Sequence, residues 1–149
     1  MTGAPSTGAP ASAIAIVVID ASVWVSRLLP RDPNNARAAT WIGRHVRSGG
    51  ILTAPTILAV EVAASITRRT GNLADAHAAA GQLYSLPFVR LAPMDQSLIT
   101  EATDLSADLG LRGADAIYVA LAKQLGIPLV TFDGEQLTRP AGVIITVSP

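Results

Sequence analysis

Apolar residues along this chain fall into two patterns, short continuous runs and longer stretches in which they recur at helical spacing. The short runs are rich in Ile, Val and Leu, which is typical of strands buried on both faces of a sheet. They predict strands at Ile14–Ile19, Ile51–Ala54, Phe88–Leu91, Pro128–Phe132 and Val143–Val147. The longer stretches predict helices at Ala21–Leu29, Asn34–Arg47, Pro55–Arg69, Leu73–Leu86, Asp95–Leu109 and Ala114–Leu125.

Strands that are separated by helices imply right-handed crossover connections between parallel strands. We therefore expect an α/β fold, a three-layer α/β/α arrangement around a central, mainly parallel sheet of about five strands. In such sheets ligands bind at the carboxyl ends of the strands, near the point where the strand order changes. The pattern itself does not fix that order.

Composition changes this picture at the amino terminus. Residues 1–13, MTGAPSTGAPASA, are low in complexity and are interpreted as a flexible tail, which leaves residues 14–149 as a single domain. Half of the chain is apolar and 15% is charged, which excludes a disordered protein. The run Ala13–Ile19 is far shorter than the roughly 20 residues that a membrane span needs, so no membrane association and a cytoplasmic location are expected.

Charge, cysteine content and the absence of glycine-rich motifs exclude several kinds of binding site. Eleven basic and eleven acidic residues balance, so no overall field attracts nucleic acid. The chain contains no cysteine, which excludes disulfides and thiolate metal sites. It also lacks the glycine-rich motifs of nucleotide cofactors, so no cofactor-binding residues are expected.

Four of the eleven acids lie where an ionised group is costly. Asp20 and Asp133 each follow a buried strand, so both should project from the same edge of the sheet. Asp115 begins an apolar helix, and Glu61 lies inside another, in ILAVEVAASI. A buried carboxylate is unfavourable unless it is paired or binds a metal.

Each acid also has a purely structural interpretation. Asp20 and Asp115 could cap the helices that follow them, because Asp is favoured at that position. Asp133 could belong to a Phe-Asp-Gly turn, and Glu61 could pair with an arginine. Taken together, the placements favour convergence on one site.

Convergence would require a counter-ion. Two carboxylates ~4 Å apart repel by roughly 4 kcal/mol at an effective dielectric constant of ~20. Mg²⁺ and Mn²⁺ prefer oxygen ligands and would relieve this repulsion. A metal held in this way can activate water and neutralise charge on a phosphodiester.

The same residues resemble a known family. Asp20-Ala21-Ser22 after a buried strand is similar to the opening motif of PIN-domain ribonucleases, especially VapC-like toxins. Glu61 and Asp115, the latter in GADAIYVALA, look like the family's second and third acids, and Thr131-Phe132-Asp133 resembles its T-x-D motif. The resemblance extends from Ile14 to Val147, and the tail before the first strand departs from the family's pattern.

This resemblance implies a Mg²⁺- or Mn²⁺-dependent endoribonuclease with an RNA substrate, a homodimeric state and, for toxin members, a cognate antitoxin protein. By the same likeness Asp20, Glu61, Asp115 and Asp133 would be catalytic and would bind the metal. Ser22 and Thr131 would be hydroxyls that orient these carboxylates.

Two further residues near the acids have open roles. Arg112, three residues before Asp115, could hold a substrate phosphate or could be an ordinary surface arginine. Glu135 stands where some relatives carry another acid, and a solvated position at a helix start is favoured for it.

Two other functions remain as alternatives. The first is a PIN-like scaffold that binds RNA or protein without catalysis, against which the complete set of four acids argues. The second is an aspartate-based phosphoryl-transfer domain with Asp20 as nucleophile. Such enzymes usually carry a second Asp where this chain has Ser22, and they need a lysine, of which the chain offers only Lys123.

Overall fold

A computed structural model describes residues 15–149 of the protein. The predicted tail, residues 1–13, and Ile14 lie outside the described residues. The chain builds a five-stranded sheet with all neighbouring strands parallel, in the order β3-β2-β1-β4-β5. The strands are β1 (Ile16–Ile19), β2 (Ile51–Pro55), β3 (Val89–Ala92), β4 (Leu129–Val130) and β5 (Thr146–Val147). The predicted α/β fold with a mainly parallel sheet is confirmed, and the observed sheet is entirely parallel.

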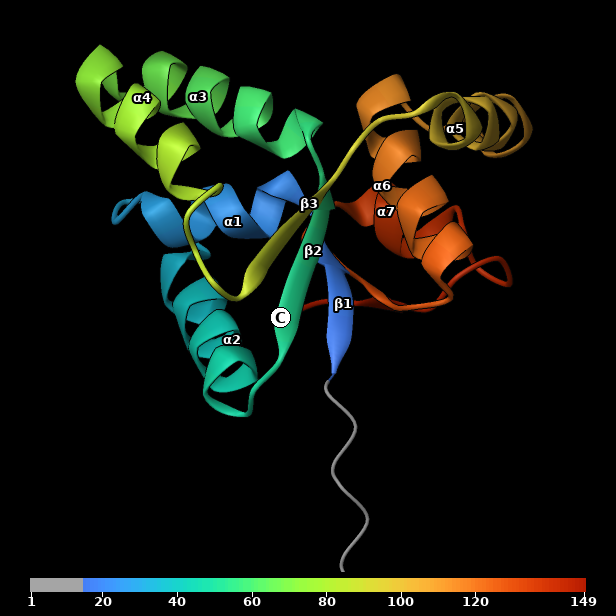
Figure 1. The fold of residues 1–149 in the computed structure, drawn as a ribbon, viewed down its shortest axis with the longest axis horizontal. Coiled ribbons are helices and arrows are strands. Elements are labelled where there is room, and N and C mark those ends of the chain that lie inside the picture. The colour runs from blue at the N-terminus through green and yellow to red at the C-terminus, as the bar shows by residue number, and fades with distance from the viewer. Residues whose placement is uncertain (1–14) are drawn as a thin grey trace, which may run out of the picture.

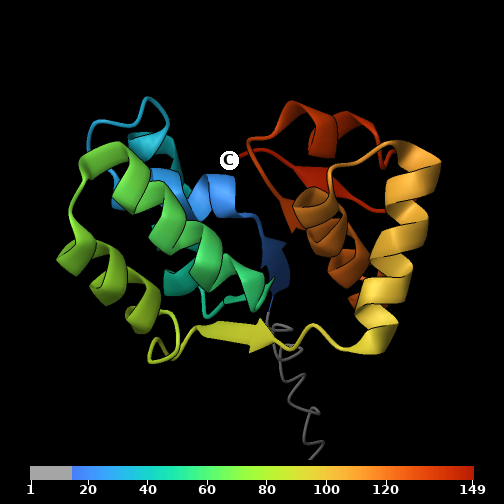
Figure 2. The same ribbon diagram turned by 90° about the horizontal axis from the view of Figure 1, so that it is seen from above.

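Helices cover both faces of this sheet, as a three-layer arrangement requires. Figures 1 and 2 show α1–α4 gathered on one side of the sheet and α5 and α6 on the other. The helices are α1 (Ala21–Leu28), α2 (Asn35–Arg47), α3 (Ile57–Thr70), α4 (Leu73–Gln82), α5 (Gln96–Leu109), α6 (Gly113–Leu125) and α7 (Gly134–Thr138).

The core lies between the sheet and these helices. Val18, Ile19 and Leu52 of the central strands are fully buried, and Tyr118 and Val119 of α6 are buried against them. Continuous β-branched runs form these strands because both of their faces are covered. Within residues 15–149, no helix is both long enough and apolar enough to span a membrane.

Several predicted elements differ in their bounds from those observed. The helix predicted to begin at Pro55 begins at Ile57, because Pro55 ends β2. The helix predicted over Leu73–Leu86 ends at Gln82, where the chain passes into turns. The last two strands have only two residues each, although Leu129 N–H still donates to the carbonyl of Ile145. The short helix α7 was not among the predicted elements, because five residues are too few to show helical periodicity.

The strand order places a switch point at the centre of the sheet. The chain runs from β1 outward through β2 to β3, then returns through α5 and α6 to β4 on the other side of β1. Connections leave β1 and β4 in opposite directions, so a crevice opens between their carboxyl ends. This crevice is where the acids that the sequence singles out should meet.

Candidate active site

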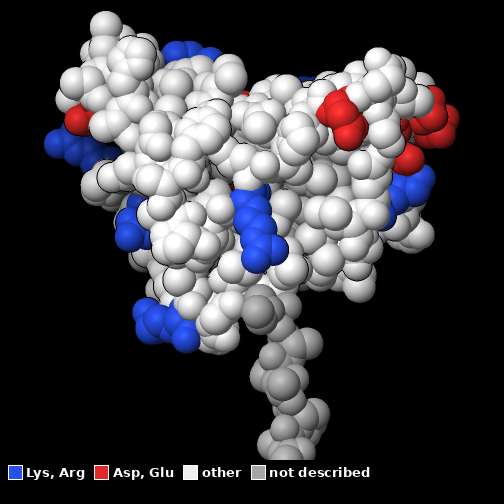
Figure 3. Space-filling view, viewed as in Figure 1, with Lys and Arg blue, Asp and Glu red and all other residues white. Residues whose placement is uncertain are grey.

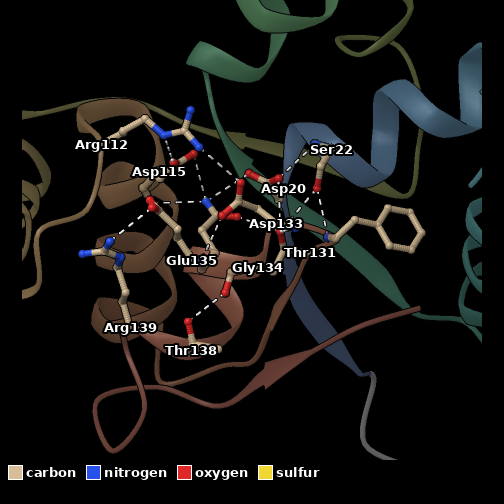
Figure 4. A network of polar contacts seen from close by, with 12 residues as sticks. Asp20, Ser22, Arg112, Asp115, Thr131, Asp133, Gly134, Glu135, Thr138 and Arg139 are labelled. Atoms are coloured by element: carbon tan, nitrogen blue, oxygen red, sulfur yellow. Dashed lines mark hydrogen bonds and ion pairs between the residues drawn. The ribbon is translucent and has the colours of Figure 1, made fainter.

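A pocket of about 450 Å³ lies at this switch point, and the four acids that the sequence singles out line it together with Asp32. The four are Asp20 after β1, Glu61 of α3, Asp115 of α6 and Asp133 after β4. Ser22 and Arg112 line the same pocket. Figure 4 shows most of this group from close by, with the side chains pointing toward one another.

Asp20 is the most buried of the pocket acids, with 5% of its surface exposed. One carboxylate oxygen, Oδ2, accepts the N–H of Ser22 at 2.9 Å and thereby caps α1. The other oxygen, Oδ1, accepts the side-chain amide of Gln136 at 3.2 Å. The carboxylate is therefore held from two sides, one on its own helix and one across the sheet edge.

Two hydroxyls tie the ends of β1 and β4 together. The Thr131 Oγ1 lies 3.2 Å from Asp20 Oδ2 and accepts the N–H of Asp133 at 2.9 Å. The Ser22 Oγ accepts the N–H of Phe132 at 3.0 Å and lies 3.3 Å from the Thr131 Oγ1. Ser22 and Thr131 thus fix the backbone and the carboxylate at the base of the pocket.

Asp133 and Asp115 share one arginine. The Arg112 Nε lies 3.3 Å from Asp115 Oδ2, and its Nη2 lies 3.6 Å from Asp133 Oδ2. The Arg112 side chain is 73% exposed, so water screens both ion pairs and the guanidinium stays accessible from solvent. Arg112 is therefore a loosely held counter-charge at the rim of the pocket.

Glu61 is paired with a tyrosine and not with an arginine. The hydroxyl of Tyr118, a fully buried residue of α6, donates to Glu61 Oε1 at 2.9 Å. Burial raises the pKa of Tyr118 far above its usual range, so it remains a proton donor. This bond links α3 to α6 across the pocket and replaces the arginine pairing considered from the sequence.

The pocket raises the pKa values of two of its acids. Burial raises the pKa of Glu61 to about 6, the Tyr118 hydrogen bond opposes the rise, and repulsion from Asp20 and Asp115 adds to it. Burial also raises the pKa of Asp115 to about 6, helped by the charges of Asp133 and Asp20 and opposed by Arg112. The pocket therefore carries more negative charge than its own residues neutralise.

Gln136, like Tyr118, is a residue beside the pocket that the sequence did not single out. It belongs to α7, is fully buried, and its Oε1 accepts from the Thr131 hydroxyl at 2.7 Å. Its amide nitrogen donates to Asp20 and also lies 3.5 Å from Asp115 Oδ1. The only signal in the sequence is its position three residues after Asp133, which makes its N–H the natural partner of that capping carboxylate.

The donor set fits a hard divalent cation, since it consists of carboxylate oxygens with surplus negative charge. Within residues 15–149, however, no three acidic or histidine side chains form a group already arranged to hold a metal ion. Arg112 bridges Asp115 and Asp133, and Gln136 lies between Asp20 and Asp115. The protein's own side chains thus occupy carboxylate oxygens that a metal ion would use.

Two residues considered from the sequence lie outside the pocket. Glu135 is in the first turn of α7 and pairs with Arg139, four residues on. Lys123 pairs with Glu101 of α5 and does not line the pocket. Without a lysine beside Asp20, the aspartate-based phosphoryl-transfer alternative lacks one of the groups it needs.

An all-parallel α/β fold with an acidic pocket at its switch point defines the class of this protein. The chain belongs to the PIN domain family, because the family model described as "PIN domain" matches residues 17–142. No curated protein sequence matches the chain significantly.

Solved structures of toxins and toxin–antitoxin complexes share this fold. VapC20 of Mycobacterium tuberculosis, described as a sarcin-ricin loop cleaving toxin, has a TM-score of 0.71 and 19% identity, covering 89% of this chain and 99% of that one. DNA-bound VapBC from Salmonella typhimurium has a TM-score of 0.66 and 13% identity, covering 91% and 98%. VapBC-5 from Mycobacterium tuberculosis has a TM-score of 0.58 and 16% identity, covering 90% and 97%. At these identities the likeness shows a common fold.

Proposed function

We propose that this protein is a Mg²⁺- or Mn²⁺-dependent endoribonuclease that hydrolyses RNA phosphodiester bonds, and that it is the toxin of a toxin–antitoxin pair. The observation that carries this proposal is the meeting of four carboxylates in one pocket at the switch point of the sheet. Membership of the PIN domain family and the fold shared with VapC20 support it.

The four acids take different parts in this chemistry. Asp20 and Asp115 would hold the metal directly, and Glu61 and Asp133 would hold it directly or through water. When bound, the ion neutralises phosphate charge and lowers the pKa of a water molecule. Hydrolysis would join a water oxygen to phosphorus as the bond to the leaving ribose oxygen breaks. The attacking water would give up a proton to a pocket carboxylate, and the leaving oxygen would take up a proton from solvent.

The neighbouring side chains orient these groups. The Ser22 N–H would fix the direction of the Asp20 carboxylate, and the Ser22 and Thr131 hydroxyls would hold the backbone beside it by accepting the N–H groups of Phe132 and Asp133. Glu61, with a pKa raised by burial to about 6, can exchange a proton near neutral pH. Arg112, exposed at the rim, would contact a non-bridging phosphate oxygen of the substrate.

Partners follow from the same proposal. VapBC structures are complexes of toxin–antitoxin systems, so we expect a cognate antitoxin protein for this chain as well. We also expect a homodimer and, because the substrate would be RNA, action in the cytoplasm. The gene beside this one should encode a small DNA-binding protein.

The test is cleavage of a panel of structured RNAs by the purified protein with Mg²⁺, with Mn²⁺, with EDTA, and by the Asp115→Asn variant. We expect metal-dependent cutting that the variant loses while its thermal unfolding stays cooperative. Asp104→Asn, on the exposed part of α5 and outside the pocket, is the matched control and should cut normally. Full-rate cutting by Asp115→Asn would contradict the assignment of Asp115.

A second candidate is a scaffold that binds RNA or protein without catalysis. The contacts of Arg112 and Gln136 with the acids favour it, because they occupy carboxylate oxygens that a metal would use. Calorimetric titration with Mn²⁺ separates the two functions. Binding that Asp115→Asn weakens supports the nuclease, and no binding at millimolar metal supports the scaffold.

A further inference from the structure

Basic charge is concentrated on one side of the molecule. Seven of the ten arginines lie between Arg27 and Arg69, a segment that holds only two of the eleven acids. This segment runs from the last two residues of α1 through α2 and β2 into the last turn of α3. Figure 3 shows several basic side chains on that side of the molecule and others at its centre and toward α5 and α6, while most of the acidic side chains in this view lie toward α5 and α6. The net charge is zero, but the charges are unevenly distributed, and the α1–α3 side of the surface favours binding of a polyanion.

A second hollow on this side continues the acidic pocket. Its volume is about 650 Å³, and residues 29–33, Arg69 and Thr70 line it. Asp32 and Arg69 line both this hollow and the acidic pocket, so the two hollows adjoin at this pair and together are called the groove. Leu29, Pro30 and Pro33 make much of the second hollow apolar.

Arg69 is held in place where the two hollows join. Its Nη1 donates to Asp32 Oδ2, and Asp32 in turn accepts the N–H of Asn34 at 2.9 Å. The Asp32 side chain is 7% exposed, whereas that of Arg69 is 54% exposed. Burial alone would raise the pKa of Asp32, but the hydrogen bonds from Arg69 and Asn34 bring it below its usual value, so the anchor stays ionised. In the part of the chain that the structure describes, Nε and Nη2 of Arg69 have no protein partner.

We propose, resting on the proposed ribonuclease function, that Arg69 binds an RNA phosphate next to the scissile one and that the hollow beyond it receives the adjoining nucleoside. An arginine fixed by a buried carboxylate loses little side-chain entropy when a phosphate joins it. The flat faces of Pro30 and Pro33 suit a base, and Arg31 adds a second guanidinium to the same hollow. With Arg112 on the opposite rim, the groove has a cation on each side of the acids.

The competing explanation for the Asp32–Arg69 pair is a structural latch between α3 and the segment after α1. A latch predicts that loss of Arg69 lowers stability alone. A phosphate site predicts that loss of Arg69 weakens RNA binding beyond the effect of losing one surface charge. Arg68 is the matched control, since it lies in the same turn of α3, is exposed, and lines neither hollow.

The experiment compares Arg69→Gln and Arg68→Gln. Binding of a fluorescein-labelled single-stranded oligouridylate is measured by anisotropy in EDTA over a range of salt concentrations. Cleavage kinetics are measured with Mn²⁺ on an RNA that the unchanged chain cuts. We expect Arg69→Gln to weaken binding about tenfold, to reduce the salt slope by about 0.7, and to raise KM with little change in kcat. Arg69→Lys should restore the salt slope and only part of the affinity.

The outcomes separate this inference from the function on which it rests. If the unchanged chain neither binds nor cuts RNA, the ribonuclease function fails and the nucleotide site fails with it. If it cuts RNA and the two glutamine variants behave alike, only the nucleotide site is wrong. A loss of thermal stability in Arg69→Gln with unchanged RNA binding identifies a latch. Unchanged RNA binding with weakened binding of the co-encoded antitoxin identifies a protein docking site instead.

Discussion

At the scale of single residues, Gln136 decides how the base of the pocket is held. Its amide nitrogen donates to Asp20 and its carbonyl oxygen accepts from Thr131, so one side chain supports two others. A fully buried amide must satisfy both groups, and a carboxylate offers it a strong acceptor. We therefore infer that Gln136 positions Asp20 and Thr131, although no motif around it in the sequence indicates this role.

We predict that Gln136→Met lowers Mn²⁺ affinity by about tenfold or more, because a partner that orients a ligating carboxylate is lost. The free energy of unfolding should fall by about 1–3 kcal/mol, since Asp20 and Thr131 lose a buried partner. Calorimetric titration and urea unfolding measure the two effects. Gln124→Met, an exposed residue of α6, makes the same chemical change outside the pocket and should alter neither. Unchanged metal affinity in a destabilised Gln136→Met would show a purely structural role.

The sequence allowed the four pocket acids to be predicted, because acids among apolar residues are unusual. It did not allow their hydrogen-bond partners to be predicted. Asp20, Glu61, Asp115 and Asp133 stand out because an acid among apolar residues is costly. Tyr118 was hidden, since a tyrosine inside an apolar helix looks like core, and its partner Glu61 is 57 residues away. Such a pairing depends on how α3 and α6 meet, which local patterns do not contain.

At the scale of elements, two of the acids that line the pocket also cap helices. For Asp20 this is the capping role considered from the sequence, whereas the sequence suggested a Phe-Asp-Gly turn for Asp133. Asp20 caps α1 and Asp133 caps α7, and both line the pocket. A residue that ends a strand at the switch point and begins a helix is placed at the sheet edge by the same geometry that makes it a cap. Asp115 is different, because it lies in the first turn of α6 after the capping position, which Arg112 occupies. The capping interpretation of Asp115 is wrong.

The two roles of Asp133 can be separated by substitution. Asp133→Asn keeps an acceptor for the N–H of Gln136 and should leave stability within about 0.5 kcal/mol, while RNA cleavage falls strongly. Asp133→Ala should lose cleavage and also about 1 kcal/mol of stability. Asp95→Ala, which removes the cap of α5 outside the pocket, should lose stability and keep cleavage. Urea unfolding and RNA cleavage are measured on all three variants, and full cleavage by Asp133→Asn would exclude Asp133 from the chemistry.

The boundary of β4, beside the pocket, differs from the prediction. The sequence predicted a strand through Phe132, whereas β4 ends at Val130 and its continuation serves the site. Thr131 N–H still pairs with Val147, while its side chain turns to Asp20. Apolar patterning reports burial, and a residue that leaves the strand to build a site remains buried, so the pattern does not mark the change.

At the scale of the whole molecule, the pocket opposes folding when no metal is bound. Glu61 and Asp115 are partly buried and repel their neighbours, so each binds its proton more tightly in the folded state than in the unfolded chain. The folded protein therefore holds more protons than the unfolded chain between about pH 4 and pH 6. Where the folded state binds more protons, the free energy of unfolding falls as the pH rises.

We predict that the metal-free protein is less stable at pH 7 than at pH 5, by on the order of 1 kcal/mol from these two groups. The stabilising protonation is present below the ordinary carboxyl pKa and is lost as the pH rises through about 6. Arg112 limits the effect, since its charge offsets part of the repulsion around Asp115. Urea unfolding in EDTA at several pH values measures this slope.

The double variant Glu61→Gln with Asp115→Asn should flatten this part of the profile, since neither amide titrates. Mn²⁺ should raise the melting temperature of the unchanged chain at pH 7 more than at pH 5, because protons compete with the metal for the same oxygens. It should leave the double variant unaffected. The metal-free chain could instead gain stability from pH 5 to pH 7, with the double variant showing the same profile. In that case repulsion between these acids does not govern stability, and it gives the pocket no energetic need for a cation.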